Sequence, residues 1–227
     1  MNWWVTETLS WPNGPVVLGS WIFWVIFSIV LHELGHGVAA IRQGDDTPIY
    51  TGHMTWNPLV HMGHMSLIAF AILGIAWGAM PVNPSRFKSR YGEAFVAAAG
   101  PLVNLMLAAV CVIASAFWPY ANGVFADHVF ENVATFFLLG AMLNLTLMLF
   151  NLVPIPPLDG SRIVGDFFPS FNRIWEGERG AVIGLIAFMG LFYFGGGRIF
   201  SVAITATHIL IDVVSLGVKA VLGAPPV

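Results

Sequence analysis

Long apolar runs separated by short polar loops dominate the pattern of this chain. The three longest runs cover residues 16–41, 94–118 and 129–153. Each is long enough to cross a bilayer as a helix, which takes about 20 apolar residues. Two shorter runs, 181–194 and 199–218, flank a glycine triplet at 195–197 and predict two more hydrophobic helices. The pattern therefore predicts an all-α polytopic membrane protein.

The stretch after the first run has a different pattern. From Thr47 to Met65, polar and apolar residues alternate among prolines and glycines, which predicts short strands or a hairpin near the membrane interface. Ser66 to Met80 is apolar but short for a span, so this segment either crosses the membrane or re-enters it. We expect five to six transmembrane helices, with a small β-hairpin and re-entrant region after the first helix.

Basic residues orient these helices, because cytoplasmic loops carry an excess of Lys and Arg. The loops 81–90 and 154–180 contain six of the nine basic residues, and the loop 119–127 contains none. We therefore expect both basic loops and the C-terminus in the cytoplasm. A re-entrant 66–80 segment adds Arg42 to that side. This favours five spans, with an outer N-terminus and an inner turn at Gln43.

Composition narrows the class of protein. Hydrophobic residues make up 57% of the chain and charged residues 9%, whereas soluble proteins carry about 25% charged residues. Such a chain needs the lipid bilayer as its solvent, and we expect a multi-pass protein of the cell membrane. The net charge is −3 and the sequence has no basic cluster, which argues against nucleic acid as a partner. Cys111 is the single cysteine, which excludes a cysteine-based zinc site.

The first apolar run contains the polar motif His32-Glu33-Leu34-Gly35-His36. Residues four apart on a helix share a face, so His32 and His36 can hold one zinc ion between their imidazoles. Glu33 lies beside them and can act as the general base toward a water that zinc activates. A chance match explains the motif poorly, because ionisable residues inside a membrane helix are costly and need partners.

A zinc ion in a catalytic site usually has three protein ligands and one open position. Asp159 is a candidate for the third ligand, because it follows the proline-broken stretch that ends the third apolar run. Backbone of this kind survives at membrane depth only where protein or a water-filled cavity surrounds it. A second interpretation stays open, in which Asp159 and Gly160 form an ordinary turn that stops the helix.

Two asparagines within the apolar runs are further candidates. Asn151 can position a substrate carbonyl or stabilise an oxyanion, and the competing interpretation is a structural role. Asn104 can likewise contact substrate, although a hydrogen bond across helices is the common role of such a residue.

These motifs together resemble those of the site-2 protease family of intramembrane zinc metalloproteases. The resemblance covers about residues 30–166 and includes, in order, the motif at 32–36, Asn57-Pro58-Leu59-Val60-His61, Pro81-Val82-Asn83-Pro84, Gly100-Pro101 with Asn104, and Asn151 through Leu158-Asp159-Gly160. It implies that Asp159 is the third ligand of one Zn²⁺ per chain and that Asn151 positions the substrate.

The resemblance also implies an activity. A zinc metalloendopeptidase of this family cleaves transmembrane segments of membrane-protein substrates, as in regulated intramembrane proteolysis. We expect the short form of the family, without a PDZ or CBS domain. It would be a single domain over 1–227, with a catalytic core at about 16–166 and C-terminal helices at about 181–218. The alternating segment 47–65 then offers an edge strand that captures unwound substrate.

One position departs from the family pattern. Short members often carry Asp two residues after the histidine that matches His61, whereas this chain has Gly63 there, followed by His64. Packing within the loop is therefore the expected role of His61 and His64.

The alternative function is a non-proteolytic membrane protein with a structural zinc site. A closed zinc site needs four protein ligands, and His61 or His64 can supply the fourth. Glu33 argues against this alternative, because a structural site has no use for a general base. A metal transporter would need polar residues through several spans, whereas this chain has one such cluster.

Overall fold

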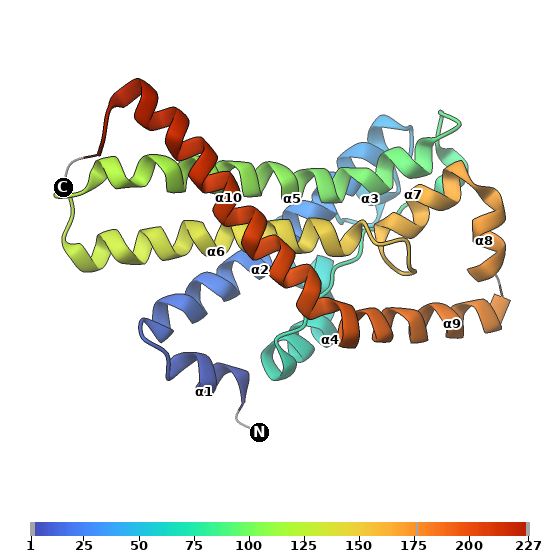
Figure 1. Ribbon diagram of the computed structural model, residues 1–227. Coiled ribbons are helices and arrows are strands. Elements are labelled where there is room, and N and C mark those ends of the chain that lie inside the picture. The colour runs from blue at the N-terminus through green and yellow to red at the C-terminus, as the bar shows by residue number, and fades with distance from the viewer. Residues whose placement is uncertain (1–2, 176, 226–227) are drawn as a thin grey trace.

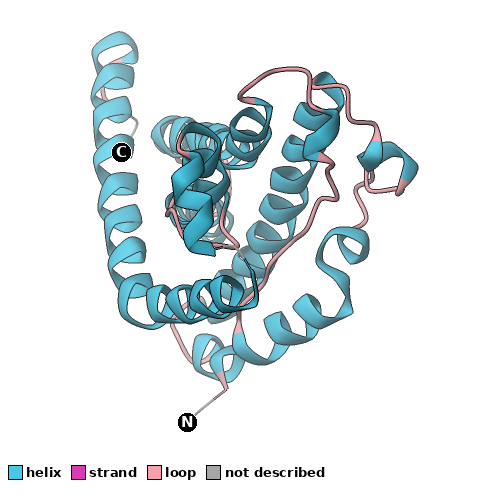
Figure 2. Cartoon of the chain, turned by 90° about the vertical axis from the view of Figure 1, so that its right-hand side faces the viewer, coloured by secondary structure: helices cyan, strands magenta, loops and turns pink. Residues whose placement is uncertain are grey.

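Helices make up the regular structure of the computed structural model, which describes residues 3–175 and 177–225 (Figure 2). The α-helices are α1 (Trp4–Leu9), α2 (Gly14–Arg42), α3 (Thr47–Tyr50), α4 (Pro58–Leu73), α5 (Gly92–Phe117), α6 (Asp127–Asn151), α7 (Asp159–Phe167), α8 (Pro169–Trp175), α9 (Gly177–Gly190) and α10 (Gly196–Leu222). Shorter elements are the 3₁₀ turns η1 (Pro84–Arg86) and η2 (Trp118–Ala121) and the π-helical segment η3 (Leu191–Gly195).

Four helical runs in the described residues are long and apolar enough to cross a membrane. They are Gly14–Arg42, Gly92–Ala121, Asp127–Asn151 and Gly177–Leu222. Their apolar outer faces suit lipid. A helix also satisfies its backbone polar groups within the segment, as a membrane-spanning element must. The chain is therefore an integral, multi-pass membrane protein.

The centre of the fold lies where α2 crosses the antiparallel pair α5 and α6 (Figure 1). Trp24 of α2, Cys111 of α5 and Ala141 of α6 belong to one buried cluster. Gly140 allows this close packing, since a Cβ atom there would lie 2.4 Å from the Trp24 ring. The Trp24 indole also donates a 2.8 Å hydrogen bond to the Phe136 carbonyl. This crossing fixes the position of the half of α2 that carries the polar motif.

The predicted β-hairpin at 47–65 is absent, and the structure forms helices α3 and α4 there instead. Pro48 and Pro58 stand in the first turns of these helices, where a proline loses no hydrogen bond. The Asn57 side chain caps α4 by accepting from the Leu59 amide. Gly63 kinks α4 with φ 65° and ψ 172°. The prolines and glycines that suggested strand ends therefore begin and bend helices, and this segment offers no edge strand.

The segment 66–80, which was predicted either to cross the membrane or to re-enter it, doubles back on itself. Helix α4 ends at Leu73, and residues 75–83 then have no regular secondary structure. Ser66 Oγ accepts from the Trp77 amide at 2.8 Å and donates to the Trp77 carbonyl at 2.6 Å. The Ala79 amide donates to the His61 carbonyl at 2.9 Å. The outward and returning chains are thus tied side by side.

The two helices expected near the C-terminus join into one helical run. The glycine triplet at 195–197 does not interrupt it, because Gly196 has φ −55° and ψ −45°, which are helical values. The π-helical segment η3 lies at the junction of α9 and α10, where the direction of the run changes (Figure 1). The described residues therefore contain four helical runs that are long and apolar enough to span a membrane.

Candidate metal centre

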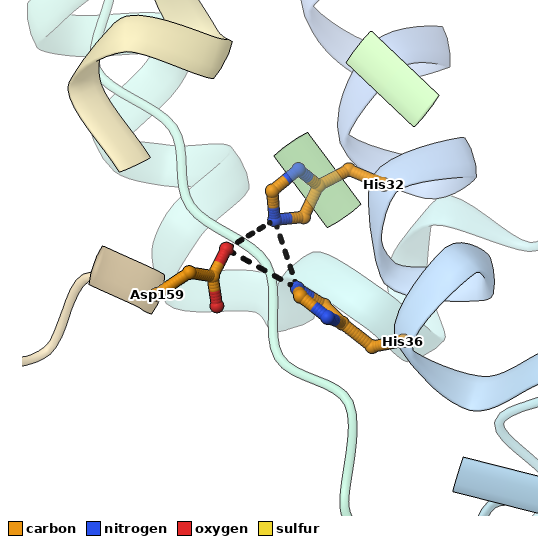
Figure 3. A group of neighbouring side chains, drawn as sticks. All are labelled: His32, His36 and Asp159. Carbon is orange, nitrogen blue, oxygen red and sulfur yellow. Dashed lines mark hydrogen bonds and ion pairs between the residues drawn. The ribbon is translucent and has the colours of Figure 1, made fainter. Parts of the chain in front are cut away.

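Three buried side chains from two distant parts of the chain converge at one point (Figure 3). His32 and His36 come from α2, and Asp159 is the first residue of α7. The two Nε2 atoms lie 3.0 Å apart, and Asp159 Oδ2 lies 3.1 Å from that of His32 and 3.4 Å from that of His36. The three residues are only 7–8% exposed.

The chain around Asp159 is shaped to bring its carboxylate back to α2. Leu158 is extended, and α7 begins directly after it. Gly160 allows this tight return, since a Cβ atom there would lie 2.3 Å from the Leu152 carbonyl oxygen. A carboxylate in the first turn of a helix is also stabilised by the helix dipole. The tight return therefore accounts for the glycine after Asp159.

Helix α5 forms the wall behind the two histidines. A Cβ atom on Gly100 would lie 2.5 Å from both Nε2 atoms, so only a glycine leaves room for the rings. His36 Nδ1 lies 2.7 Å from the Val96 carbonyl, and His32 Nδ1 lies 2.6 Å from Asn104 Oδ1. A carbonyl oxygen only accepts, so the Nδ1–H of His36 donates to Val96. The ring lone pair of His36 is then on Nε2.

The donor set fits a zinc ion. With both Nδ1 atoms protonated, two Nε2 lone pairs and a carboxylate oxygen face one another, and Asp159 Oδ2 is buried without a hydrogen bond. Three acceptors at these distances repel one another unless a cation lies between them. Ligands about 2.0–2.1 Å from a tetrahedral zinc ion are roughly 3.3 Å apart, which is close to the observed separations. Imidazole and carboxylate ligands of this kind are typical of zinc sites.

Glu33 is buried on α2 next to this cluster and faces the irregular segment 75–83. A Cβ atom on Gly78 would lie 2.5 Å from Glu33 Oε1, so the backbone passes directly over the carboxylate. Gly100 belonged to the Gly100-Pro101 motif of the family resemblance but had no assigned role, and sequence reasoning did not mention Gly78. Neither glycine has a positive φ, so the packing of distant elements is what makes them necessary.

The other candidates lie away from the three converging atoms. Asn104 is fully buried behind His32, and Asn151 is half-buried at the end of α6, where its Nδ2 donates to the Leu147 carbonyl at 3.0 Å. His61 is buried with its Nε2 2.7 Å from the Thr55 carbonyl, and His64 is exposed. Neither histidine belongs to the metal-binding group found in the described residues.

Comparison with known proteins places this geometry in a family context. The model of peptidase family M50 matches residues 20–123 and 120–195. The chain is 36% identical over 174 residues to "Putative zinc metalloprotease YwhC" of Bacillus subtilis, covering 74% of this chain and 77% of that protein.

More distant relatives bear similar names. Rip2 of Mycolicibacterium smegmatis, named in the same way as YwhC, is 33% identical over 153 residues, which cover 64% of this chain and 54% of Rip2. "Zinc metalloprotease MJ0392" of Methanocaldococcus jannaschii is 29% identical over 159 residues, which cover 66% of this chain and 37% of that protein. No solved structure gives a significant match. The resemblance inferred from the motifs is confirmed by the family match.

Proposed function

The chain belongs to peptidase family M50, and on that premise we propose that it is an intramembrane zinc metalloprotease that cleaves transmembrane segments of membrane proteins. The zinc ligands are His32, His36 and Asp159, and the general base is Glu33. The observation that carries this proposal is the convergence of two Nε2 atoms and one carboxylate oxygen within 3.4 Å of one another in a buried site.

Bound zinc supplies a Lewis acid that polarises the scissile carbonyl and makes water a stronger nucleophile. Glu33 takes the proton of the attacking water and returns it to the leaving amine, which is general base and then general acid catalysis. Asn151 positions the substrate carbonyl, since its Nδ2 carries a second N–H beyond the one that bonds to Leu147. The substrate must unwind locally, because its helical carbonyls are otherwise hydrogen-bonded.

A closed structural zinc site is the less favoured alternative. It would need a fourth protein ligand, yet the backbone carbonyl of Thr55 holds His61 and His64 is exposed. A three-ligand site with an open position is the arrangement that catalysis requires.

Glu33→Gln tests the proposal. Gln is nearly isosteric with Glu, so we expect the variant to keep about one zinc ion per chain. Gln cannot accept a proton, so we expect no measurable hydrolysis. Zinc is measured by elemental analysis of the purified protein in detergent. Cleavage is measured in cells that co-express single-span membrane proteins as substrates. The Asp159→Ala, His36→Ala double variant is the control, which should lose both zinc and cleavage. Cleavage by Glu33→Gln at near the wild-type rate would show that Glu33 is not the general base.

We also propose that the protein lies in the cell membrane and crosses it four times. The doubled-back 66–80 segment re-enters instead of crossing, because Ser66 and Trp77 are held together. The helical run Gly177–Leu222 crosses once, since α9 and α10 both run from the α7 end of the molecule toward the connection between α5 and α6 (Figure 1). The N- and C-termini then lie outside, and the ends that carry the metal centre face the cytoplasm.

A further inference from the structure

A line of hydrogen bonds runs from the metal centre through α5 into α6. His32 Nδ1 lies 2.6 Å from Asn104 Oδ1, and Asn104 Nδ2 donates to Asn144 Oδ1 at 3.0 Å. Asn144 Nδ2 in turn donates to the Gly140 carbonyl at 2.9 Å. Both asparagines are 0% exposed, so water does not compete for these bonds.

The Gly140 carbonyl sets the direction of every bond in this line. A carbonyl oxygen only accepts, so Asn144 must turn its amide nitrogen toward Gly140 and its oxygen toward Asn104. Asn104 must then present its nitrogen to Asn144 and its oxygen to His32. An amide oxygen also only accepts, so His32 must carry its proton on Nδ1.

This order of donors determines which nitrogen of His32 can bind a metal. With the proton on Nδ1, the lone pair of the ring is on Nε2, the atom that lies 3.1 Å from Asp159 Oδ2. His36 reaches the same state directly, because its Nδ1 lies 2.7 Å from the Val96 carbonyl. The tautomers of the two histidines are therefore set by different hydrogen-bond partners. A backbone oxygen orients His36, whereas His32 depends on an amide that could turn around if nothing held it.

We propose that Asn144 is a positioning residue of the metal centre: through Asn104 it holds His32 in the tautomer whose Nε2 lone pair faces the metal. The proposal rests on the zinc site of the proposed function and extends it to a residue on α6 that does not touch that site. Without Asn144, the Asn104 amide is free to turn its nitrogen toward His32. That orientation favours a proton on Nε2, and this proton competes with the metal.

Zinc affinity is the decisive measurement, and it is independent of hydrolysis. Leu is close to Asn in size and makes no hydrogen bonds, so Asn144→Leu keeps the packing and removes the relay. Loss of such an outer partner lowers metal affinity about 10- to 100-fold, and we expect a decrease in this range. Affinity is measured by competition between metal-free protein in detergent and a chromophoric zinc chelator. Thr207→Val is the matched control, because it removes a buried hydroxyl that bonds to the Ala203 carbonyl on α10.

A second variant separates the relay from simple packing. Both oxygens of a carboxylate accept, so Asp at position 104 needs no partner to orient it toward His32. The double variant Asn104→Asp, Asn144→Leu should therefore regain most of the affinity that Asn144→Leu loses. A packing defect at Asn144 would not be repaired in this way. If the double variant binds zinc no more tightly than Asn144→Leu, or if Asn144→Leu binds like wild type, the proposal is wrong.

A spectroscopic measurement tests the inference on the unaltered chain. In metal-free protein with ¹⁵N-labelled histidines, the His32 signals, identified by their loss in His32→Ala, should show the Nδ1-protonated neutral form. An Nε2-protonated His32 would overturn the proposal even if Asn144→Leu could not be purified in folded form. Wild-type protein that binds no zinc at all would instead reject the proposed function.

Discussion

At the scale of single residues, two glycines set how closely α2 approaches α5. A Cβ atom on Gly35 would lie 2.8 Å from Val103 Cγ2 and 3.1 Å from the Ala99 carbonyl. On the facing helix, a Cβ atom on Gly100 would lie 2.5 Å from both ligand nitrogens. His32 and His36 thus lie against a part of α5 where Gly100 presents no side chain.

Gly100→Ala should therefore disrupt the metal centre. The added methyl group occupies the space of the two Nε2 atoms, and the imidazoles must turn away from Asp159. We expect zinc affinity to fall at least about tenfold, as for other changes that misorient a ligand. The measurement is the same chelator competition.

Gly19→Ala on the exposed face of α2 is the matched control, because nothing lies within 4 Å of a Cβ atom there. It makes the same chemical change in a helix and should leave zinc affinity unchanged. Equal affinities for the Gly100 and Gly19 variants would show that the helix spacing matters little.

At the scale of elements, Asp45 ties the turn after α2 to the segment that leads away from Glu33. It is 0% exposed, and its Oδ2 accepts from the Asn83 amide at 2.6 Å. Its Oδ1 accepts from the amide and the hydroxyl of Thr47. Burial acts to raise the pKa of the Asp45 carboxyl, but these hydrogen bonds outweigh it and hold the pKa below its usual 3.8. The charged form therefore stabilises this junction.

Asp45→Asn should lower the stability of the fold by roughly 1–3 kcal/mol, the range for hydrogen bonds to a charged group. An amide has one acceptor oxygen where the carboxylate has two, so at least one backbone donor loses its partner. The melting temperature in detergent, followed by circular dichroism, measures the effect. Asp46→Asn is the control, since the neighbouring Asp46 makes no side-chain cap to α3.

Wild type and Asp45→Asn should also differ in how their stability depends on pH, and the sign of this difference follows from the lowered pKa of Asp45. A lowered pKa contributes stability above the unfolded value of 3.8, and this contribution disappears as the pH falls through the folded pKa. The difference in melting temperature between wild type and Asp45→Asn should therefore be constant above about pH 5 and shrink below pH 4. A difference that grows in acid would contradict the role of the ionised carboxylate.

At the scale of the whole molecule, the distribution of charge and the fold agree on which end of the molecule faces the cytoplasm. Seven of the nine basic residues lie in loops, short helices or helix ends at the end of the molecule that carries the metal centre (Figure 1), namely Arg42, Arg86, Lys88, Arg90, Arg162, Arg173 and Arg179. Lys219 is near the opposite end, in the last turn of α10. Because cytoplasmic segments carry the excess of positive charge, the metal centre should lie toward the cytoplasmic side.

Single cysteines in a Cys111→Ala background test the four-span topology. An impermeant thiol reagent added to intact cells should label Thr6→Cys and Ala224→Cys and leave Gln43→Cys unlabelled. Permeabilised cells should label all three positions, which shows that each is reactive. Labelling of Gln43→Cys from outside would mean that 66–80 crosses the membrane. Protection of Ala224→Cys would mean that α9 and α10 cross separately, as the sequence had suggested.

The errors of sequence reasoning share a physical cause. Proline and glycine in 47–65 were interpreted as strand breakers, yet Pro58 begins α4 and Gly63 bends it. The glycines at 195–197 were interpreted as a helix break, yet they are helical. Proline is favoured in a first helical turn, and glycine can continue a helix at a cost of only about 0.5–1 kcal/mol relative to alanine, so neither residue type alone decides between a break and a continuation.

The sequence by itself determined the membrane environment and the two histidines with Glu33, because both depend on local properties. Hydropathy depends on runs of neighbouring residues, and the i, i+4 spacing puts two imidazoles on one face of any helix. Asp159 was a candidate from sequence, but only the tertiary structure brings its carboxylate to α2 across more than 120 residues of chain. Only the tertiary structure shows what Gly78, Gly100 and Asn144 contact, since a distant helix or loop lies beside each of them.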